Sequence, residues 1–280
     1  MWHKNASVFG IAKQKDLDLS LLSDNTFLPA EEAESSGWGE VRDGTLYFRT
    51  GNQILLQFMQ EKKHIPKSAV DVKVDEWTTE QFNERGFVPG KKATKEKRGQ
   101  IVDQLLPRAL PTRRRTAVWI DLDKQRLVID STSWPVIDEV IRALVKAYEG
   151  LNIEDAKWPS HKVVTEWLVS QPDDFTTDDE VTLRYPGESG RVVKYTKANL
   201  DAVDVQNHVK THEANVESMA MTFDSRISFI MTPNMMLRRI KALDVITSSE
   251  KVADVDAFEN DFVLMAGELS RLFDVLGSLK

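Results

Sequence analysis

The chain has 280 residues, of which 41% are hydrophobic and 8% aromatic, as in folded globular proteins and unlike disordered chains. It contains no cysteine, which excludes disulfide bonds, cysteine nucleophiles and zinc sites with cysteine ligands. No apolar run approaches the ~20 residues of a membrane-spanning helix, and the first residues are polar where a signal peptide is apolar. We therefore expect a cytoplasmic protein that makes no contact with a membrane.

The charge of the chain is distributed unevenly. The net charge is −7, yet nine basic residues between positions 91 and 115 face only two acidic ones. These basic residues are Lys91, Lys92, Lys95, Lys97, Arg98, Arg108, Arg113, Arg114 and Arg115. Such segregation predicts one positive surface on an otherwise acidic protein. The simpler alternative is a solvated, lysine-rich helix face followed by a turn.

The N-terminal half alternates hairpins with helices. Two apolar runs around a Gly-Asn turn predict a β-hairpin at 46–58. The polar segment 70–104 predicts one or two charged helices that project from the body. A second hairpin is predicted at 117–130, and a helix with an early proline at 133–150.

The C-terminal half repeats this alternation. It predicts a helix at 161–170, a hairpin at 181–196, a helix at 200–215 and a hairpin at 218–231. Apolar residues then recur at spacings of three and four over 258–276, which predicts a helix that packs on the core or on a partner helix. Hairpins without βαβ units predict an α+β fold with antiparallel sheets.

We divide the chain into four parts of a single unit. Residues 1–69 form the N-terminal β-rich part of the body, and 70–116 form a projecting, basic helical arm with its tip. Residues 117–175 form a hairpin–helix part of the body, and 176–280 contain the C-terminal hairpins and helices.

No residue pattern predicts a cofactor. The segment 86–92 resembles a phosphate-binding loop, but its spacer is one residue short and Lys92 stands where a Ser or Thr is required. His208 and His212 have the spacing of two metal ligands on a helix, although a surface or helix-packing pair is the better interpretation. Asp43 and Glu61-Lys62-Lys63 have roughly the order of a two-metal nuclease site, an order that chance also produces.

Two further clusters of basic residues lie nearer the C-terminus: Arg184, Arg191, Lys194 and Lys197, and then Arg226, Arg238, Arg239 and Lys241. Three separate clusters in an acidic chain favour a partner with a phosphate backbone.

The order of short motifs along the chain resembles the family of the recombination-associated protein RdgC. The motifs are Trp2-His3-Lys4-Asn5, Gly37-Trp38, Leu105-Leu106-Pro107-Arg108-Ala109, Trp119-Ile120-Asp121, Thr165-Glu166-Trp167-Leu168, Asn207-His208-Val209, Asp224-Ser225-Arg226-Ile227-Ser228-Phe229, Leu237-Arg238-Arg239-Ile240-Lys241 and 261–269. Each motif is short, but their order and spacing cover nearly the whole chain.

The resemblance implies an α+β homodimer that closes into a ring with a positively charged hole. Such a protein binds double-stranded DNA with little sequence preference, is nucleoid-associated and restrains the RecA recombinase, without enzymatic activity. Binding of single-stranded DNA stays open. Two other functions also stay open: a metal-dependent exonuclease acting on recombining DNA ends, and a module that docks a recombinase through the C-terminal helix and the tip.

The resemblance also implies roles for individual residues. The segment 105–110 would form the tip of the arm, where Arg108 and Leu110 of two subunits meet. Lys197 falls where the family has a basic residue lining the hole. The family tends to have an aromatic residue at the position of Leu110, so we expect weaker ring closure here. The candidates for contact with DNA are Lys91, Lys92, Lys95, Lys97, Arg98, Arg113, Arg114, Arg115, Arg191, Lys194 and Lys197.

Overall fold

The structure is a computed structural model that describes residues 2–12, 16–187, 190–211, 213–234, 236–244 and 257–279. The strands are β1 Ala6–Ile11, β2 Glu34–Gly39, β3 Tyr47–Thr50, β4 Gln53–Lys63, β5 Pro111–Asp121, β6 Arg126–Ile129, β7 Ile153–Asp155, β8 Phe175–Arg184, β9 Val192–Thr196, β10 Asn215–Phe223, β11 Ile227–Thr232 and β12 Met236–Ala242. The helices are η1 Leu19–Asn25, α1 Lys67–Arg85, α2 Lys91–Leu105, η2 Leu106–Arg108, α3 Trp134–Ala147, α4 His161–Glu166, α5 Val203–Lys210 and α7 Ala257–Ser278.

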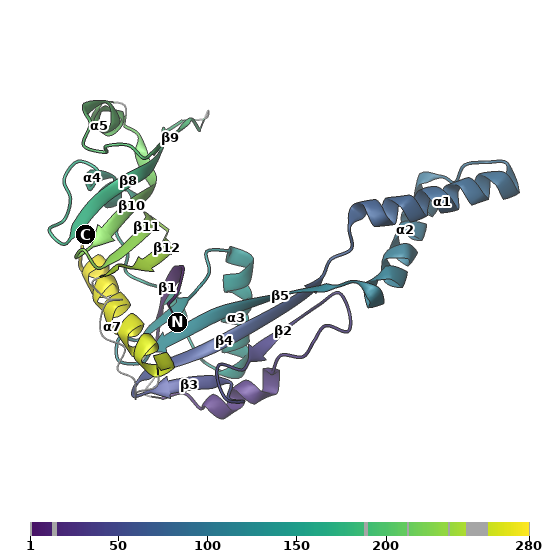
Figure 1. The fold of residues 1–280 in the computed structure, drawn as a ribbon, viewed down its shortest axis with the longest axis horizontal. Coiled ribbons are helices and arrows are strands. Elements are labelled where there is room, and N and C mark those ends of the chain that lie inside the picture. The colour runs from purple at the N-terminus through teal and green to yellow at the C-terminus, as the bar shows by residue number, and fades with distance from the viewer. Residues whose placement is uncertain are drawn as a thin grey trace.

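The strands form one curved antiparallel sheet (Figure 1). Its order is β2-β4-β5-β6-β1-β12-β11-β10-β8-β9, with β3 paired to β4 and β7 paired to β1. The expected α+β fold with a large antiparallel sheet is confirmed. The four predicted hairpins correspond to the pairs β3–β4, β5–β6, β8–β9 and β10–β11. The first strand, β1, lies in the middle and joins the two halves of the sheet.

Two predicted helices are shorter than expected. The helix predicted at 200–215 is reduced to α5, because Val216, Met219 and Met221 are buried from the strand β10, which already begins at Asn215. The helix predicted at 161–170 ends at Glu166. No helix in the described part of the chain has the length and apolarity to cross a membrane.

The two faces of the sheet are covered differently along its length. Because side chains alternate along a strand, Trp119 of β5 points to one face and its neighbours Val118 and Ile120 point to the other. The helices α4, α5 and α7 pack on the face of Trp119, and the apolar side of α7 is thereby buried in the core. On the other face, the described core under α3 and η1 includes residues of β2, β4, β5, β6 and β1, and it reaches β12 at Met236.

The second face is polar over the C-terminal strands. Thr182 of β8 and Ser228 of β11 lie there, while their neighbours Val181, Leu183 and Phe229 are buried on the face of α7. We call this surface of β8–β12, opposite α7, the open face. Figure 1 shows the C-terminal hairpins and the arm rising on the same side of the body, with α3 between them.

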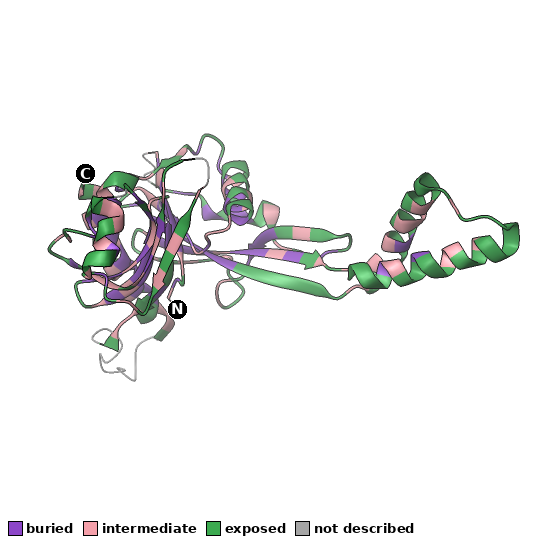
Figure 2. Cartoon of the chain, turned by 90° about the horizontal axis from the view of Figure 1, so that it is seen from above, coloured by how far each residue is buried: buried purple, intermediate pink, exposed green. Residues whose placement is uncertain are grey.

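A long two-stranded ribbon carries the arm away from the body (Figure 2). The strands β4 and β5 pair without interruption from Gln53–Asp121 to Lys63–Pro111, and the residues of β5 become exposed before Thr116. The helices α1 and α2 continue from this ribbon as the arm. Among the described arm residues, only Val70, Val74 and Ile101 form a buried cluster, close to the ribbon.

The predicted position of the tip is wrong. The segment 105–110 lies where α2 joins β5, because α2 runs back toward the ribbon (Figure 1). The far end of the arm is instead the loop between α1 and α2. Gly86 ends α1 there with a φ of 72°, and its backbone N–H donates to the carbonyl of Phe82.

Candidate nucleic-acid interface

The open face brings basic residues of β9 and β12 together around one carboxylate. The ammonium group of Lys194 lies 3.0 Å from Glu180 Oε1, and the guanidinium of Arg239 lies 3.2 Å from Glu180 Oε2. Arg238 and Lys241 are exposed beside Arg239, and neither takes part in an ion pair with another described residue. The hydrogen bond from Lys194 is the main cause of the lowered pKa of Glu180.

The other candidates on the third hairpin lie at its edge. The Arg191 guanidinium lies 5.1 Å from the centre of the Tyr185 ring, a cation–π contact. Lys197 is exposed just after β9, with a left-handed φ of 53°. Arg184 binds Glu217 at 2.7 Å. The hairpin therefore holds several of its cations in contacts within the protein.

The three consecutive arginines of β5 point to both faces of the ribbon. Arg113 and Arg115 lie on the face of Trp119, whereas Arg114 lies on the face of α3. Arg114 shares a hollow with Arg142 of α3, a residue that the sequence did not single out. The arginines therefore lie in two separate hollows, and each hollow also contains acidic side chains.

Arg113 has a buried partner. Its Nε and Nη2 groups donate to Glu61 Oε2 at 2.9 and 2.7 Å, and its guanidinium lies 5.2 Å from the centre of the Phe27 ring. Glu61 also accepts the backbone N–H of Ala30 at 2.9 Å, and this bond, followed by the one from Arg113, lowers the pKa of Glu61. Arg113 thus fastens the ribbon to the loop at Ala30.

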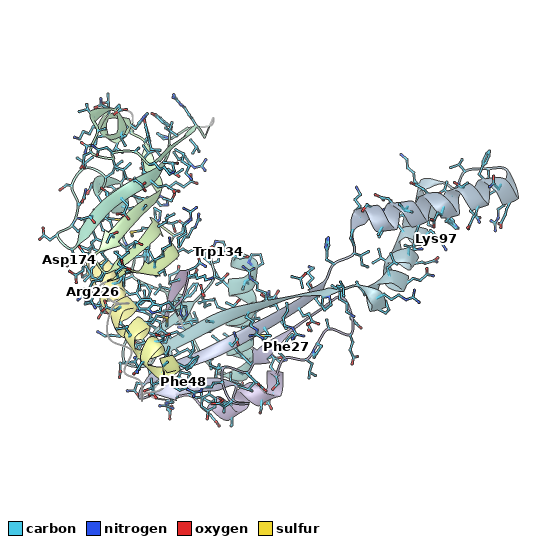
Figure 3. The ribbon with its side chains drawn as sticks, in the orientation of Figure 1. Phe27, Phe48, Lys97, Trp134, Asp174 and Arg226 are labelled. Carbon is cyan, nitrogen blue, oxygen red and sulfur yellow. The ribbon has the colours of Figure 1, made fainter. Side chains whose placement is uncertain are left out.

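The cations of the arm lie on α2. Lys91, Lys92 and Lys95 are exposed, and none of them forms an ion pair within the described ranges. Lys97 lies over the ring of Trp77 on α1, 5.9 Å from its centre (Figure 3), and Arg98 binds Asp71 of α1 at 2.6 Å. The first three lysines are free to meet a partner, while Lys97 and Arg98 hold α2 against α1.

The two residues expected at the dimer interface are exposed at the start of the ribbon. Leu110 is 85% exposed, the highest fraction among the large exposed hydrophobic side chains, and Arg108 is exposed in η2. Single exposed apolar side chains are normal on protein surfaces, so the exposure of Leu110 alone does not define an interface.

The carboxylates expected for a two-metal nuclease are not assembled. Glu61 is buried and bound to Arg113, and Asp43 is exposed and lines the hollow of Arg113 and Arg115 without Glu61. Among the described residues there is no group of three or more His, Asp or Glu side chains that could hold a metal.

The histidine pair is also committed elsewhere. His208 Nε2 lies 2.6 Å from the Tyr195 hydroxyl, and His208 Nδ1 contacts the Tyr185 hydroxyl. His212 lies outside the described residues. His208 therefore joins α5 to the β8–β9 hairpin.

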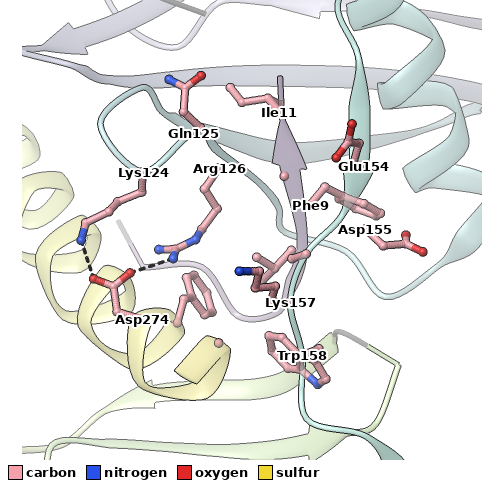
Figure 4. Close-up of a pocket in the computed structure, with 15 residues that line it drawn as sticks. Phe9, Ile11, Lys124, Gln125, Arg126, Glu154, Asp155, Lys157, Trp158 and Asp274 are labelled. Atoms are coloured by element: carbon pink, nitrogen blue, oxygen red, sulfur yellow. Dashed lines mark hydrogen bonds and ion pairs between the residues drawn. The ribbon is translucent and has the colours of Figure 1, made fainter. Parts of the chain in front are cut away.

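A further hollow lies between β1, β7 and the end of α7 (Figure 4). Lys124 and Arg126 both bind Asp274 there, at 2.6 and 2.8 Å. The remaining charges are Lys157, Glu154 and Asp155, so basic and acidic side chains balance. This balance disfavours the binding of a polyanion in this hollow.

Comparison with known proteins gives consistent matches over the whole chain. A family model described as "Putative exonuclease, RdgC" matches residues 1–279. "Recombination-associated protein RdgC" of Burkholderia cenocepacia is 36% identical, covering 99% of this chain and 96% of that protein. Proteins of the same name from Paraburkholderia phymatum and a Janthinobacterium species are 35% and 34% identical, over 98% and 100% of this chain and 94% and 98% of their own lengths.

Proposed function

The chain belongs to the RdgC family, and we propose that it binds double-stranded DNA without sequence preference in recombination. The observation that carries this proposal is the position of the exposed cations. They lie on the open face and on α2, and the C-terminal hairpins and the arm extend from the same side of the body (Figure 1). Lys and Arg contacts to phosphates supply affinity and carry no base sequence. Single strands, with their lower charge density, bind more weakly through the same contacts.

Two copies of the chain enclose the DNA in this proposal. Exposed Leu110 and Arg108 lie at the root of each arm and supply a contact between subunits. Burial of Leu110 against its counterpart stabilises a closed ring by removing apolar surface from water. DNA inside the ring is inaccessible to a RecA-type recombinase. Because the protein binds DNA without sequence preference, it is also associated with the nucleoid.

A metal-dependent exonuclease is the second candidate, favoured by the name of the matching family, "Putative exonuclease, RdgC". It requires Glu61 to leave Arg113 and to approach Asp43, which lines a different hollow. Incubation of end-labelled duplex with magnesium or manganese tests this function. Shortening of the duplex that is lost in Glu61→Ala, but not in a variant of exposed Glu166, would establish it.

The first experiment on DNA binding is fluorescence anisotropy with a labelled duplex of random sequence, over a salt series without divalent metal. We expect log affinity to fall linearly with log salt, with a slope of about 0.9 per phosphate contacted. A variant in which Lys91, Lys92 and Lys95 are changed to Gln is expected to lower affinity and to reduce the slope by up to about 2.7. Lys162→Gln, on α4 behind the sheet, is the control, and absence of binding at low salt would refute the proposal.

A further inference from the structure

Glu180 is held on the open face between two cations that come from distant strands. Lys194 reaches it from the neighbouring strand β9, and Arg239 reaches it from β12, across β11 and β10. The carboxylate side chain is only 15% exposed, whereas Lys194 and Arg239 are 51% and 66% exposed. The two cations therefore lie outermost, where a ligand arriving from solvent meets them first.

Irregularities in two strands create this arrangement. The register between β8 and β10 shifts beside Glu180, between the pairs of Met219 and Met221. The register between β11 and β12 shifts again between Ser228 and Ile230, and Arg239 takes a left-handed φ of 51°. A bulge lets consecutive residues of one strand be exposed together, as Arg238 and Arg239 are. For an arginine this backbone conformation is strained, and strain of this kind concentrates at functional sites.

We propose that Glu180 occupies a phosphate subsite, and that Lys194 and Arg239 bind a phosphate of the DNA backbone when it displaces this carboxylate. The inference deepens the DNA-binding function proposed above and rests on it. The two carboxylate oxygens each satisfy one cation. Two oxygens of a phosphodiester can make the same charge-assisted contacts.

An internal carboxylate makes the subsite selective for dense polyanions. Because Glu180 is attached to the chain, it competes with ligands at a high effective concentration. A small anion must displace it unaided. A duplex brings further phosphates that Arg238 and Lys241, exposed beside Arg239, can bind at the same time. Glu180 thus determines which anions are bound.

The test compares Glu180→Gln with Glu166→Gln. Both variants lose one negative charge, but Glu166 lies on α4, on the covered side of the sheet. Among the described residues, its carboxylate forms an ion pair only with Lys162, at 3.9 Å. We expect Glu180→Gln to bind the random duplex about threefold to tenfold more tightly at low salt. We expect its salt slope to steepen by about 0.9, one phosphate. Glu166→Gln should leave both quantities near those of the parent protein.

Further variants show whether the gain comes from the two cations. Replacing Lys194 and Arg239 with Gln in the Glu180→Gln protein should abolish the gain. A gain that survives these replacements, or one equal to that of Glu166→Gln, would overturn the subsite, as would weaker binding by folded Glu180→Gln. Should Glu180→Gln not fold, Glu180→Thr removes the carboxylate with a residue that favours strands and carries the same expectations.

Pyrophosphate separates this inference from the proposed function. We expect it to shift the Arg239 Nε–H resonance of Glu180→Gln saturably and at lower concentration than in the parent protein. This result without any duplex binding would retain the anion subsite and refute DNA binding. Duplex binding by the parent, with Glu180→Gln indistinguishable from Glu166→Gln in both assays, would retain the function and refute the subsite.

Discussion

The most exposed lysines of the arm and the two cations around Glu180 on the open face are held in opposite ways. On α2, Lys91, Lys92 and Lys95 stand in solvent on a helix pair with few buried residues. On the open face, Lys194 and Arg239 are fixed to Glu180 above a sheet whose other side is fully packed. The lysines of the arm can therefore change conformation to meet a partner, whereas Lys194 and Arg239 keep a fixed position on the sheet.

The arm also separates its charges between its two helices. Helix α1 has five acidic and three basic residues, whereas α2 has five basic and two acidic residues. The contacts of Arg98 with Asp71 and of Lys97 with Trp77 join them. Because exposed ion pairs contribute only about 0–1 kcal/mol each, we expect the arm to open without the body.

The largest expected effect comes from matched truncations in the two regions. Phe262 of α7 is fully buried and packs edge to face on Phe48, with ring centres 5.9 Å apart. Phe262→Ala should lower the free energy of unfolding by about 3–5 kcal/mol in a denaturant titration. Ile101→Ala in the arm should leave this transition in place and instead lower the protection of α1 and α2 in hydrogen exchange. A shared loss in both variants would show that arm and body unfold as one unit.

A smaller effect is expected on acidification, and it belongs to the body. His3 is buried, with its backbone N–H and Nδ1 3.2 and 3.0 Å from the sulfur of Met265 on α7. Burial lowers the pKa of His3 from 6.5 to about 4, against the opposing charge of Asp130. His3 is therefore protonated below about pH 6.5 in the unfolded chain, but only below about pH 4 in the folded chain.

The contribution of His3 to stability is complete above pH 6.5 and falls as the pH drops toward 4. At pH 5 we expect a loss of about 2 kcal/mol in the free energy of unfolding relative to pH 8. Urea titrations at both pH values measure it, and His3→Gln is the control that retains the carboxylate titrations. An equal pH dependence in His3→Gln would contradict this assignment. The protection factors of the arm amides in hydrogen exchange, which are corrected for the intrinsic effect of pH, should lack this dependence.

The smallest expected effect concerns the proposed contact between subunits. Leu110→Phe enlarges the exposed apolar side chain at the root of the arm and should tighten self-association by about threefold, as measured by sedimentation velocity. Leu28, which is 71% exposed, provides the matched substitution Leu28→Phe outside this segment. Equal changes in both variants would indicate unspecific association and remove Leu110 from the interface.

Local patterns along the chain predicted most elements but not their assembly. Alternating apolar residues around short turns located the strands of β5–β6 and β10–β11, and the apolar spacing at 258–276 located α7. No local pattern could show that β1 pairs with both β6 and β12, because these partners are more than 100 residues away in sequence. One continuous sheet was therefore not predictable.

The candidate site was predictable in its charge and not in its contacts. The basic residues were evident from the sequence. Arg113, Arg114 and Arg115 were assigned to the arm, however, and their division between two faces follows only from the strand β5, which already begins at Pro111. The role of Glu180 depends on two register shifts and on Arg239 reaching across three strand spacings. The burial of Glu61 beneath Arg113 likewise requires the full pairing of β4 with β5.

The central position of β1 bears on the order in which the chain folds as it is synthesised. Strand β1 is made before all of its partners: it pairs with Arg126 to Ile129 of β6 on one edge, and on the other edge it pairs with Met236 and Leu237 of the much later strand β12. Until β12 emerges, much of that second edge stays unpaired, and unpaired edges recruit strands of other chains. Nascent or truncated chains that end before β12 should thus be the form most dependent on chaperones.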